Sequence, residues 1–255
     1  MKSVYRQSNT ILGELVQVRT FFQLILLATI LSAQWCFAGE DLITTAHDRS
    51  GVVIPYVLNY TNLSPRYALI LFPGSSGVVD PHMEDGILVY SAKDNFLLRA
   101  RTFVVDDEFV TVATNATQSE DRIQGVIDDL MKRFPNVKIY LVGTSRGTFD
   151  TMALAEYLSD KIAGEIHTSS MQSIASFDAR KYPNRHLVVH HRHDTCKETP
   201  FASAESSHTQ YGNDFIVMDG GVSIGNPCKS FANHGYNGIE RETADAIKKW
   251  IKQGG

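Results

Sequence analysis

Apolar residues along this chain fall into short β-branched runs that alternate with longer stretches of helical spacing. Short apolar runs bounded by turn residues indicate strands, and apolar positions three and four residues apart indicate helices. The turn residues Asp48 to Gly51 separate the first two runs, which predicts a β-hairpin. The expected strands are 42–46, 52–60, 67–72, 109–113, 137–142, 165–169, 187–191 and 215–218, and the expected helices are 93–105, 121–134, 149–158 and 238–251.

From residue 67 to residue 169 the expected strands alternate with expected helices. Such alternation is typical of an α/β protein whose mostly parallel central sheet carries helices on both faces. Active sites in these sheets lie beyond the carboxyl ends of the strands. Candidate functional residues are therefore sought where the strands end.

The first segment of the chain has a different pattern. Lys2, Arg6 and Arg19 precede an apolar stretch from Phe21 to Ala33, and Cys36 and Ala38 supply small residues at the positions before a cleavage site. This pattern predicts a signal peptide over residues 1–38 and a single domain over residues 39–255, in a periplasmic or secreted protein. The apolar stretch is short for a membrane span, so we expect no stable span after cleavage; an uncleaved N-terminal anchor is the alternative.

The composition is that of an ordinary globular protein. Of the 255 residues, 43% are hydrophobic and 20% are charged, and the formal net charge is -4. No basic stripe accompanies this weakly acidic balance. Nucleic acid is therefore not an expected partner.

The stretch Gly143-Thr144-Ser145-Arg146-Gly147 has the pattern G-x-S-x-G. It stands between an expected strand and an expected helix, which is the setting of a nucleophile elbow. The glycines leave room for a sharp turn that exposes the serine hydroxyl. We therefore interpret Ser145 as the nucleophile of a serine hydrolase.

An acid and a base are then expected in the chain order Ser, Asp or Glu, His. Asp194 follows the expected strand 187–191, and His234 follows the expected strand 215–218. His234 would accept the proton of Ser145, and Asp194 would hold the imidazole tautomer and stabilise the imidazolium. Other acids remain as alternatives to Asp194, namely Asp178, Glu198 and Asp219.

The oxyanion hole needs two backbone N–H groups. One is expected from Arg146, directly after the nucleophile, and the other from the loop after the strand 67–72. That loop is rich in small residues, and Ser75 is the preferred donor within it. Gly74 and Ser76 are the alternatives.

The chain has three cysteines, and Cys36 falls in the predicted signal peptide. Cys196 and Cys228 remain as an even pair in an exported protein, which favours a disulfide over two free thiols. Cys196 follows the expected acid and Cys228 precedes the expected base. A bridge between them would hold the acid loop and the base loop together.

Segments 71–74, 143–147, 189–196 and 227–235 resemble compact α/β-hydrolases of the dienelactone-hydrolase-like type, in particular exported bacterial members with a histidine-rich strand end. The resemblance implies a carboxylesterase-like serine hydrolase of the α/β-hydrolase fold that acts on a small-molecule acyl substrate without a cofactor. The segment between residues 158 and 187 is short, so no large lid is expected. Typical dienelactone hydrolases use a cysteine nucleophile where this chain has Ser145, so lactone chemistry is not carried over.

Two other functions compete with this interpretation. A metal-dependent hydrolase would use the histidine-rich strand end, but alternation along a strand places His190 opposite His191 and His193. We therefore predict no metal site there, although His186 and Asp194 also lie nearby in the sequence. A non-catalytic binding protein of the same fold is the third possibility, and the intact set of Ser, Asp and His argues against it.

Overall fold

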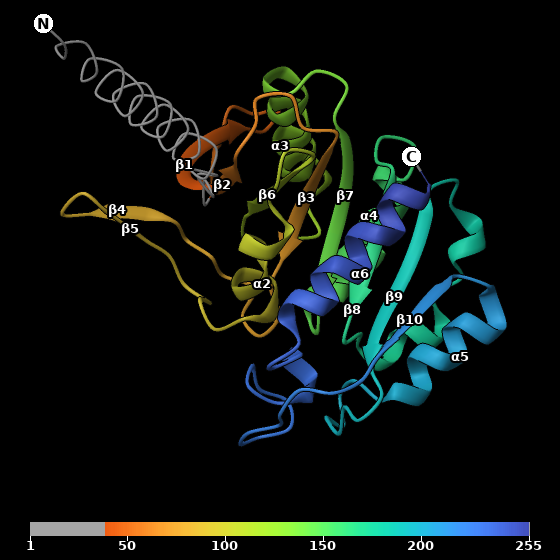
Figure 1. Ribbon diagram of the computed structural model, residues 1–255. Coiled ribbons are helices and arrows are strands. Elements are labelled where there is room, and N and C mark those ends of the chain that lie inside the picture. Colours follow the sequence, from red (N-terminus) through yellow and green to blue (C-terminus); the bar gives the residue numbers. More distant parts are fainter. Residues whose placement is uncertain (1–38, 255) are drawn as a thin grey trace, which may run out of the picture. The chain divides into compact units, whose positions relative to one another are not determined.

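The computed structural model of the protein describes residues 39–254 (Figure 1). The predicted signal peptide, its cleavage after Ala38 and the possible N-terminal anchor lie outside these residues. Within them, no helix has the length and apolar character needed to cross a membrane.

A twisted eight-stranded sheet forms the centre of the fold, in the order β1-β2-β6-β3-β7-β8-β9-β10. β2 pairs antiparallel with β1 and β6, and the pairs from β6 through β10 are parallel. This arrangement confirms the predicted mostly parallel sheet. The strands are β1 (Glu40–His47), β2 (Val53–Tyr60), β3 (Tyr67–Phe72), β6 (Phe109–Ala113), β7 (Lys138–Thr144), β8 (Gly164–Thr168), β9 (Arg185–His191) and β10 (Asp214–Met218).

Helices cover both faces of the sheet, as predicted (Figure 1). α3 and α4 pack their apolar residues against one face, and α5 lies over β9 on the same side. α2 and α6 pack together against the other face, where Trp250 and Ile251 belong to one buried apolar cluster with strand residues such as Leu69. The helices are α2 (Phe96–Val104), α3 (Glu120–Arg133), α4 (Gly147–Leu158), α5 (Phe201–Tyr211) and α6 (Glu240–Gln253).

Two parts of the fold were not expected from the sequence. α5 buries only Ala204 and Ser207 of its own residues, so it has no apolar stripe that a periodicity search would detect. The short strands β4 (His82–Glu84) and β5 (Ile87–Val89) form a hairpin that projects from the sheet (Figure 1). Between β8 and β9 the chain forms only the short helices η1 (Gln172–Ser176) and η2 (Ala179–Lys181), as expected for a fold without a large lid.

Candidate active site

The turn between β7 and α4 has the geometry of a nucleophile elbow. Ser145 adopts a positive φ of 51°, a strained conformation for a residue with a side chain. A Cβ atom on Gly147 would lie 2.3 Å from the Phe72 carbonyl oxygen, and one on Gly143 would lie 2.5 Å from the Gly147 carbonyl oxygen. Only glycine therefore fits at these two positions of the motif.

Hydrogen bonds from neighbouring elements fix this strained turn. The Ser145 N–H donates to the Thr168 carbonyl at the end of β8, at 3.1 Å. The Thr148 hydroxyl donates to the Ser145 carbonyl at 2.6 Å and accepts the Met171 N–H at 3.2 Å. The backbone of the elbow is thus held from both sides, which compensates for its strained conformation.

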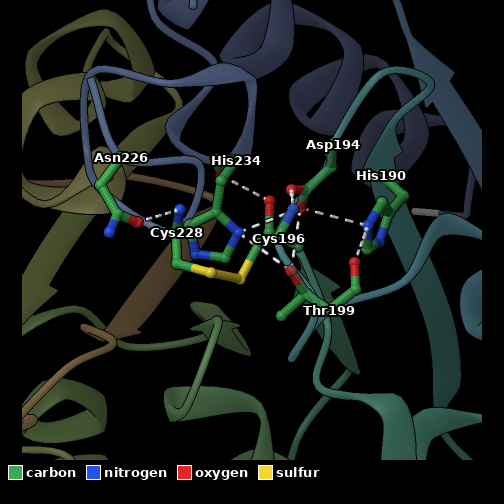
Figure 2. The surroundings of a disulfide bond; sticks show 8 residues. His190, Asp194, Cys196, Thr199, Asn226, Cys228 and His234 are labelled. Carbon is green, nitrogen blue, oxygen red and sulfur yellow. Dashed lines mark hydrogen bonds and ion pairs between the residues drawn. A yellow bond between two sulfur atoms is a disulfide. The ribbon is translucent and has the colours of Figure 1, made fainter. Parts of the chain in front are cut away.

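The structure brings the expected acid and base together (Figure 2). His234 Nδ1 lies 3.0 Å from Asp194 Oδ2, and both side chains are buried. Asp178 pairs instead with Arg180. The exposed Asp219 lies near Arg192 and His193, and Glu198 is an exposed residue that lines the cavity. Asp194 is therefore the acid that the fold places on His234.

Asp194 is held as a carboxylate by several donors. Burial raises its pKa, but hydrogen bonds from His190 and His234 lower it, and the pKa remains well below its ordinary value. The Cys196 N–H donates to Oδ1 at 2.9 Å, and the Thr199 hydroxyl donates to Oδ2 at 3.0 Å. An ionised acid is the form that can stabilise an imidazolium on His234.

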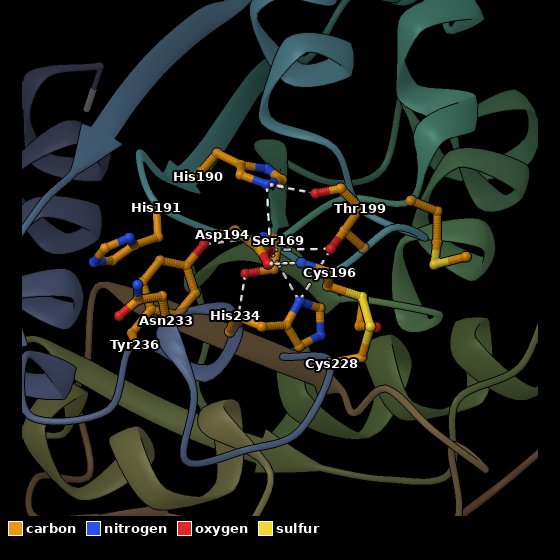
Figure 3. Close-up of polar contacts among 12 residues, drawn as sticks. Ser169, His190, His191, Asp194, Cys196, Thr199, Cys228, Asn233, His234 and Tyr236 are labelled. Atoms are coloured by element: carbon orange, nitrogen blue, oxygen red, sulfur yellow. Dashed lines mark hydrogen bonds and ion pairs between the residues drawn. A yellow bond between two sulfur atoms is a disulfide. The ribbon is translucent and has the colours of Figure 1, made fainter. Parts of the chain in front are cut away.

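Thr199 and His190 belong to this network and were not expected from the sequence (Figure 3). The Thr199 hydroxyl lies 3.1 Å from His234 Nδ1 as well as beside Asp194. His190 Nε2 lies 3.0 Å from the Thr199 carbonyl oxygen and 3.4 Å from Asp194 Oδ2. Both residues orient Asp194. The sequence does not indicate that the chain turns back after Asp194 and so places Thr199 beside it.

The loop that carries His234 is anchored through its backbone (Figure 3). The Ser169 hydroxyl donates to the His234 carbonyl at 2.6 Å. The buried Tyr236 hydroxyl donates to the Val189 carbonyl at 2.8 Å and accepts the Ser169 N–H at 2.9 Å. A Cβ atom on Gly235 would lie only 2.0 Å from the Ser230 carbonyl oxygen, so this tight loop requires glycine.

The structure contains the disulfide that the sequence favours. Cys196 and Cys228 are bonded, with their Cα atoms 4.7 Å apart (Figure 2). Cys196 directly follows the turn that holds Asp194, and Cys228 belongs to the loop that leads to His234. The bridge therefore joins the two loops that carry the acid and the base.

Removing this bridge should lower the stability of the protein. For the 32-residue separation of the two cysteines, the Cys196→Ser, Cys228→Ser double variant should lose about 3 to 4 kcal/mol of unfolding free energy, mainly through gained entropy of the unfolded chain. Urea unfolding of the oxidised protein and the variant measures the difference. Wild-type protein treated with dithiothreitol is the matched control and should unfold like the variant. An unchanged midpoint in both would contradict the prediction.

One cavity of about 580 Å³ brings the expected site residues together. Ser145, His234, Arg146 and Ser75 all line it, and so does the disulfide. Within residues 39–254 no hydrogen bond joins the Ser145 hydroxyl to His234. Catalytic hydrogen bonds are often long before substrate binds, so this geometry is compatible with a serine–histidine pair.

The expected oxyanion donors belong to two residues that line this cavity. The N–H groups of Ser75 and Arg146 have no acceptor in the described part of the chain. Ser75 has a positive φ of 61°, a second strained residue beside Ser145. Two unpaired N–H groups at the mouth of the elbow suit an oxyanion that develops on a substrate.

Gly74 sets the distance between the oxyanion loop and the nucleophile. A Cβ atom there would lie 2.8 Å from Ser145 Cβ and 2.9 Å from the Thr144 carbonyl oxygen. Gly74→Ala should push the Ser75 N–H out of position and lower kcat for an ester by about 100- to 1000-fold. Steady-state rates measure this, with thermal unfolding to show that the variant folds. Ser76→Ala, on the same exposed loop, is the control and should keep its rate; a folded Gly74→Ala variant with full kcat contradicts the prediction.

The side chains of the histidine-rich strand end have different neighbours in the structure. His190 contacts Asp194, whereas His191 Nε2 lies 2.9 Å from the Gly220 carbonyl oxygen. His193 is exposed to solvent. His186 lies at the start of β9, among different neighbours.

The sequence matches no protein-family model and no curated protein sequence. Solved structures are similar over most of this chain. Est1E from Butyrivibrio proteoclasticus has a TM-score of 0.56 at 17% identity, covering 83% of this chain and 98% of its own. XC6422 from Xanthomonas campestris, described as an α/β serine hydrolase without a lid, has a TM-score of 0.54 at 13% identity, with coverages of 83% and 95%. The esterase domain of a Rhodothermus marinus protein has a TM-score of 0.54 at 10% identity, with coverages of 84% and 98%.

The chain has the α/β-hydrolase fold. The resemblance inferred from the sequence is thereby confirmed at the level of the fold. Within this fold, the elbow follows β7, the acid loop follows β9 and the base loop follows β10. The three candidate residues therefore stand at the carboxyl ends of parallel strands, where open α/β sheets carry their sites.

Proposed function

We propose that this protein is a serine hydrolase that cleaves an ester or a related acyl bond of a small molecule through an acyl-enzyme. The observation that carries this proposal is the arrangement around one cavity. A strained serine at an elbow shares the cavity with His234, and the buried Asp194 contacts His234 at Nδ1. The esterase domain and the lidless serine hydrolase among the similar structures support the same chemistry.

Each step of the reaction uses one of these groups. Ser145 Oγ bonds to the acyl carbon as its proton passes to His234, and Asp194 stabilises the resulting imidazolium. The N–H groups of Arg146 and Ser75 receive the negative charge that develops on the carbonyl oxygen. His234 then protonates the leaving group as the acyl–oxygen bond breaks. Water, deprotonated by His234, attacks the acyl-enzyme and releases the acid and free Ser145.

We further propose that the protein is exported, with residues 1–38 as the signal. The Cys196–Cys228 disulfide supports this, because such bonds persist in the periplasm and outside the cell and are rare in the cytosol. The cavity mouth is lined by side chains of both charges, including Lys93, Asp94 and Lys229. This mixed lining favours neither a positively nor a negatively charged acyl substrate.

A fluorophosphonate probe tests the proposed nucleophile. The probe should label folded wild-type protein covalently at Ser145, as located by peptide mass spectrometry, because only an activated serine reacts readily. Ser145→Ala should remain unlabelled. Ser76→Ala, which removes an exposed serine at the same cavity, is the control and should label as the wild type does. Absence of labelling in folded wild type, or labelling of Ser145→Ala, contradicts the proposal and favours a non-catalytic binding protein.

A further inference from the structure

Three buried polar side chains meet on β8 and β9, away from the residues that line the Ser145 cavity. Glu165 and His167 are two residues apart on β8 and so share one face of the sheet. His186 on β9 stands opposite Glu165 in the parallel register. Glu165 and His167 are fully buried, and His186 is 6% exposed. None of the three lines the catalytic cavity.

Their donor atoms converge without hydrogen bonding to one another. Glu165 Oε2 lies 3.9 Å from His167 Nε2 and 3.7 Å from His186 Nδ1, and one donor atom from each residue lies within 4.8 Å of the others. Within residues 39–254, five of their polar atoms have no hydrogen-bond partner: both Glu165 carboxylate oxygens, His167 Nε2 and both His186 ring nitrogens. Buried polar groups are nearly always paired, so five unpaired atoms in one place require an explanation.

The spacing fits a shared metal ion. Two ligands that each lie about 2 Å from a metal ion are separated by about 3 to 4 Å, which is longer than a hydrogen bond. The separations of Glu165 from His167 and from His186 are of that size. Two imidazoles and a carboxylate are also a ligand set that Zn²⁺ accepts, with a fourth position left open.

The other nitrogen of His167 is arranged as it is in metal-bound histidines. His167 Nδ1 lies 2.9 Å from the Thr151 hydroxyl on α4. That hydroxyl donates its own hydrogen to the Thr148 carbonyl at 3.2 Å, so it accepts the Nδ1–H of His167. The lone pair of His167 is then on Nε2, which faces Glu165. Metal-ligating histidines usually donate their second N–H to a fixed acceptor in this way.

One of the three residues, His186, borders a second cavity. This cavity, of about 190 Å³, is lined by His186 and Asn184 together with residues near the end of α5. Both side-chain polar atoms of Asn184 also lack partners in the described part of the chain. An ion could therefore enter beside His186, and the amide oxygen of Asn184 or a water molecule could occupy the fourth position.

We propose that Glu165, His167 and His186 form a binding site for a divalent transition-metal ion, with Zn²⁺ the ion that best fits the donor set. The site links neighbouring elements of the fold. It joins β8 to β9, and through Thr151 it contacts α4, the helix that begins at the nucleophile elbow. Sequence reasoning assigned no metal to the chain, because the ligands become neighbours only when β8 and β9 pair.

Titration of metal-free protein tests the site. Untagged protein is stripped with a chelator and titrated with Zn²⁺ by calorimetry, and with Co²⁺ by visible absorption. Wild type should bind one equivalent, its melting temperature should rise on binding, and bound Co²⁺ should show d–d bands of nitrogen and oxygen coordination. Glu165→Gln and His186→Gln, both close in size to the original residues, should weaken binding by at least about tenfold.

His193→Gln is the matched control, because His193 is an exposed histidine of the histidine-rich stretch. It should bind Zn²⁺ as the wild type does. Absence of saturable binding in wild type, or equal affinity in Glu165→Gln and His186→Gln, overturns the proposal. Loss of binding in His193→Gln alone also overturns it, since the ion would then sit elsewhere. Fluorophosphonate labelling of the same samples tests the proposed function separately, because none of the three residues lines the Ser145 cavity.

Discussion

Replacing His234 with alanine should lower kcat/KM for an activated ester by about a million-fold, to the level of a protein that lacks the whole Ser-His-Asp set. The effect is large because, within residues 39–254, His234 is the one histidine that lines the cavity of Ser145. The other titratable lining residues are exposed to solvent, and His190 is directed at Asp194 and Thr199. Initial rates on a panel of chromogenic esters of increasing acyl length measure the loss.

Two comparisons make the result specific. His193→Ala removes an exposed histidine near the same loops and should change the rate by less than about twofold, as a surface substitution does. The Ser145→Ala, His234→Ala double variant should be no slower than either single variant, because the two residues act as one unit. A His234→Ala variant that keeps more than about a hundredth of the wild-type rate contradicts the assigned base.

Asp194→Asn should lower kcat by about ten-thousand-fold with little change in KM. The carboxylate accepts hydrogen bonds from the Thr199 hydroxyl and the Cys196 N–H, so an amide placed there must present its NH₂ group to at least one donor. An asparagine in that position cannot hold the Nδ1–H tautomer of His234 as the carboxylate does. The lost acceptor should also cost about 1 to 3 kcal/mol of stability. Rates on the best ester and urea unfolding measure the two effects.

Asp219→Asn is the matched control for Asp194→Asn. Asp219 also follows a strand and was an alternative acid on sequence grounds, but it is exposed and lies beside Arg192. Its substitution should leave both rate and stability near the wild-type values. If Asp219→Asn were inactive and Asp194→Asn active, the acid would be assigned wrongly.

The sheet and the order of the candidate triad could be predicted from sequence because both depend on local patterns. The apolar runs around Leu69, Leu141 and Val188 mark buried strands, and strand ends determine which loops reach the same edge of the sheet. The elbow could be predicted because Gly143 and Gly147 leave room that no other residue allows. Each of these features is determined by residues that are close together in the sequence.

The remaining features depend on contacts between distant segments. α5 packs through Ala204 and Ser207, too small a surface to give a periodic signal. Thr199 reaches Asp194 only because the chain turns back after Cys196. Glu165 and His167 on β8 give no sign of a shared site until β9 places His186 beside Glu165. A single sequence does not show which segment will supply such a neighbour.

The Cys196–Cys228 bond closes a loop that contains all of α5 and β10. Among the strands of residues 39–254, β10 is the outermost on its side of the sheet and pairs with β9 alone, so it is a candidate for transient local opening in the native state. Both ends of that loop are joined covalently beside Asp194 and His234. The acid and the base therefore stay together when β10 opens and its amide hydrogens exchange with solvent. In the oxidised protein, opening of β10 does not break the Asp194–His234 contact.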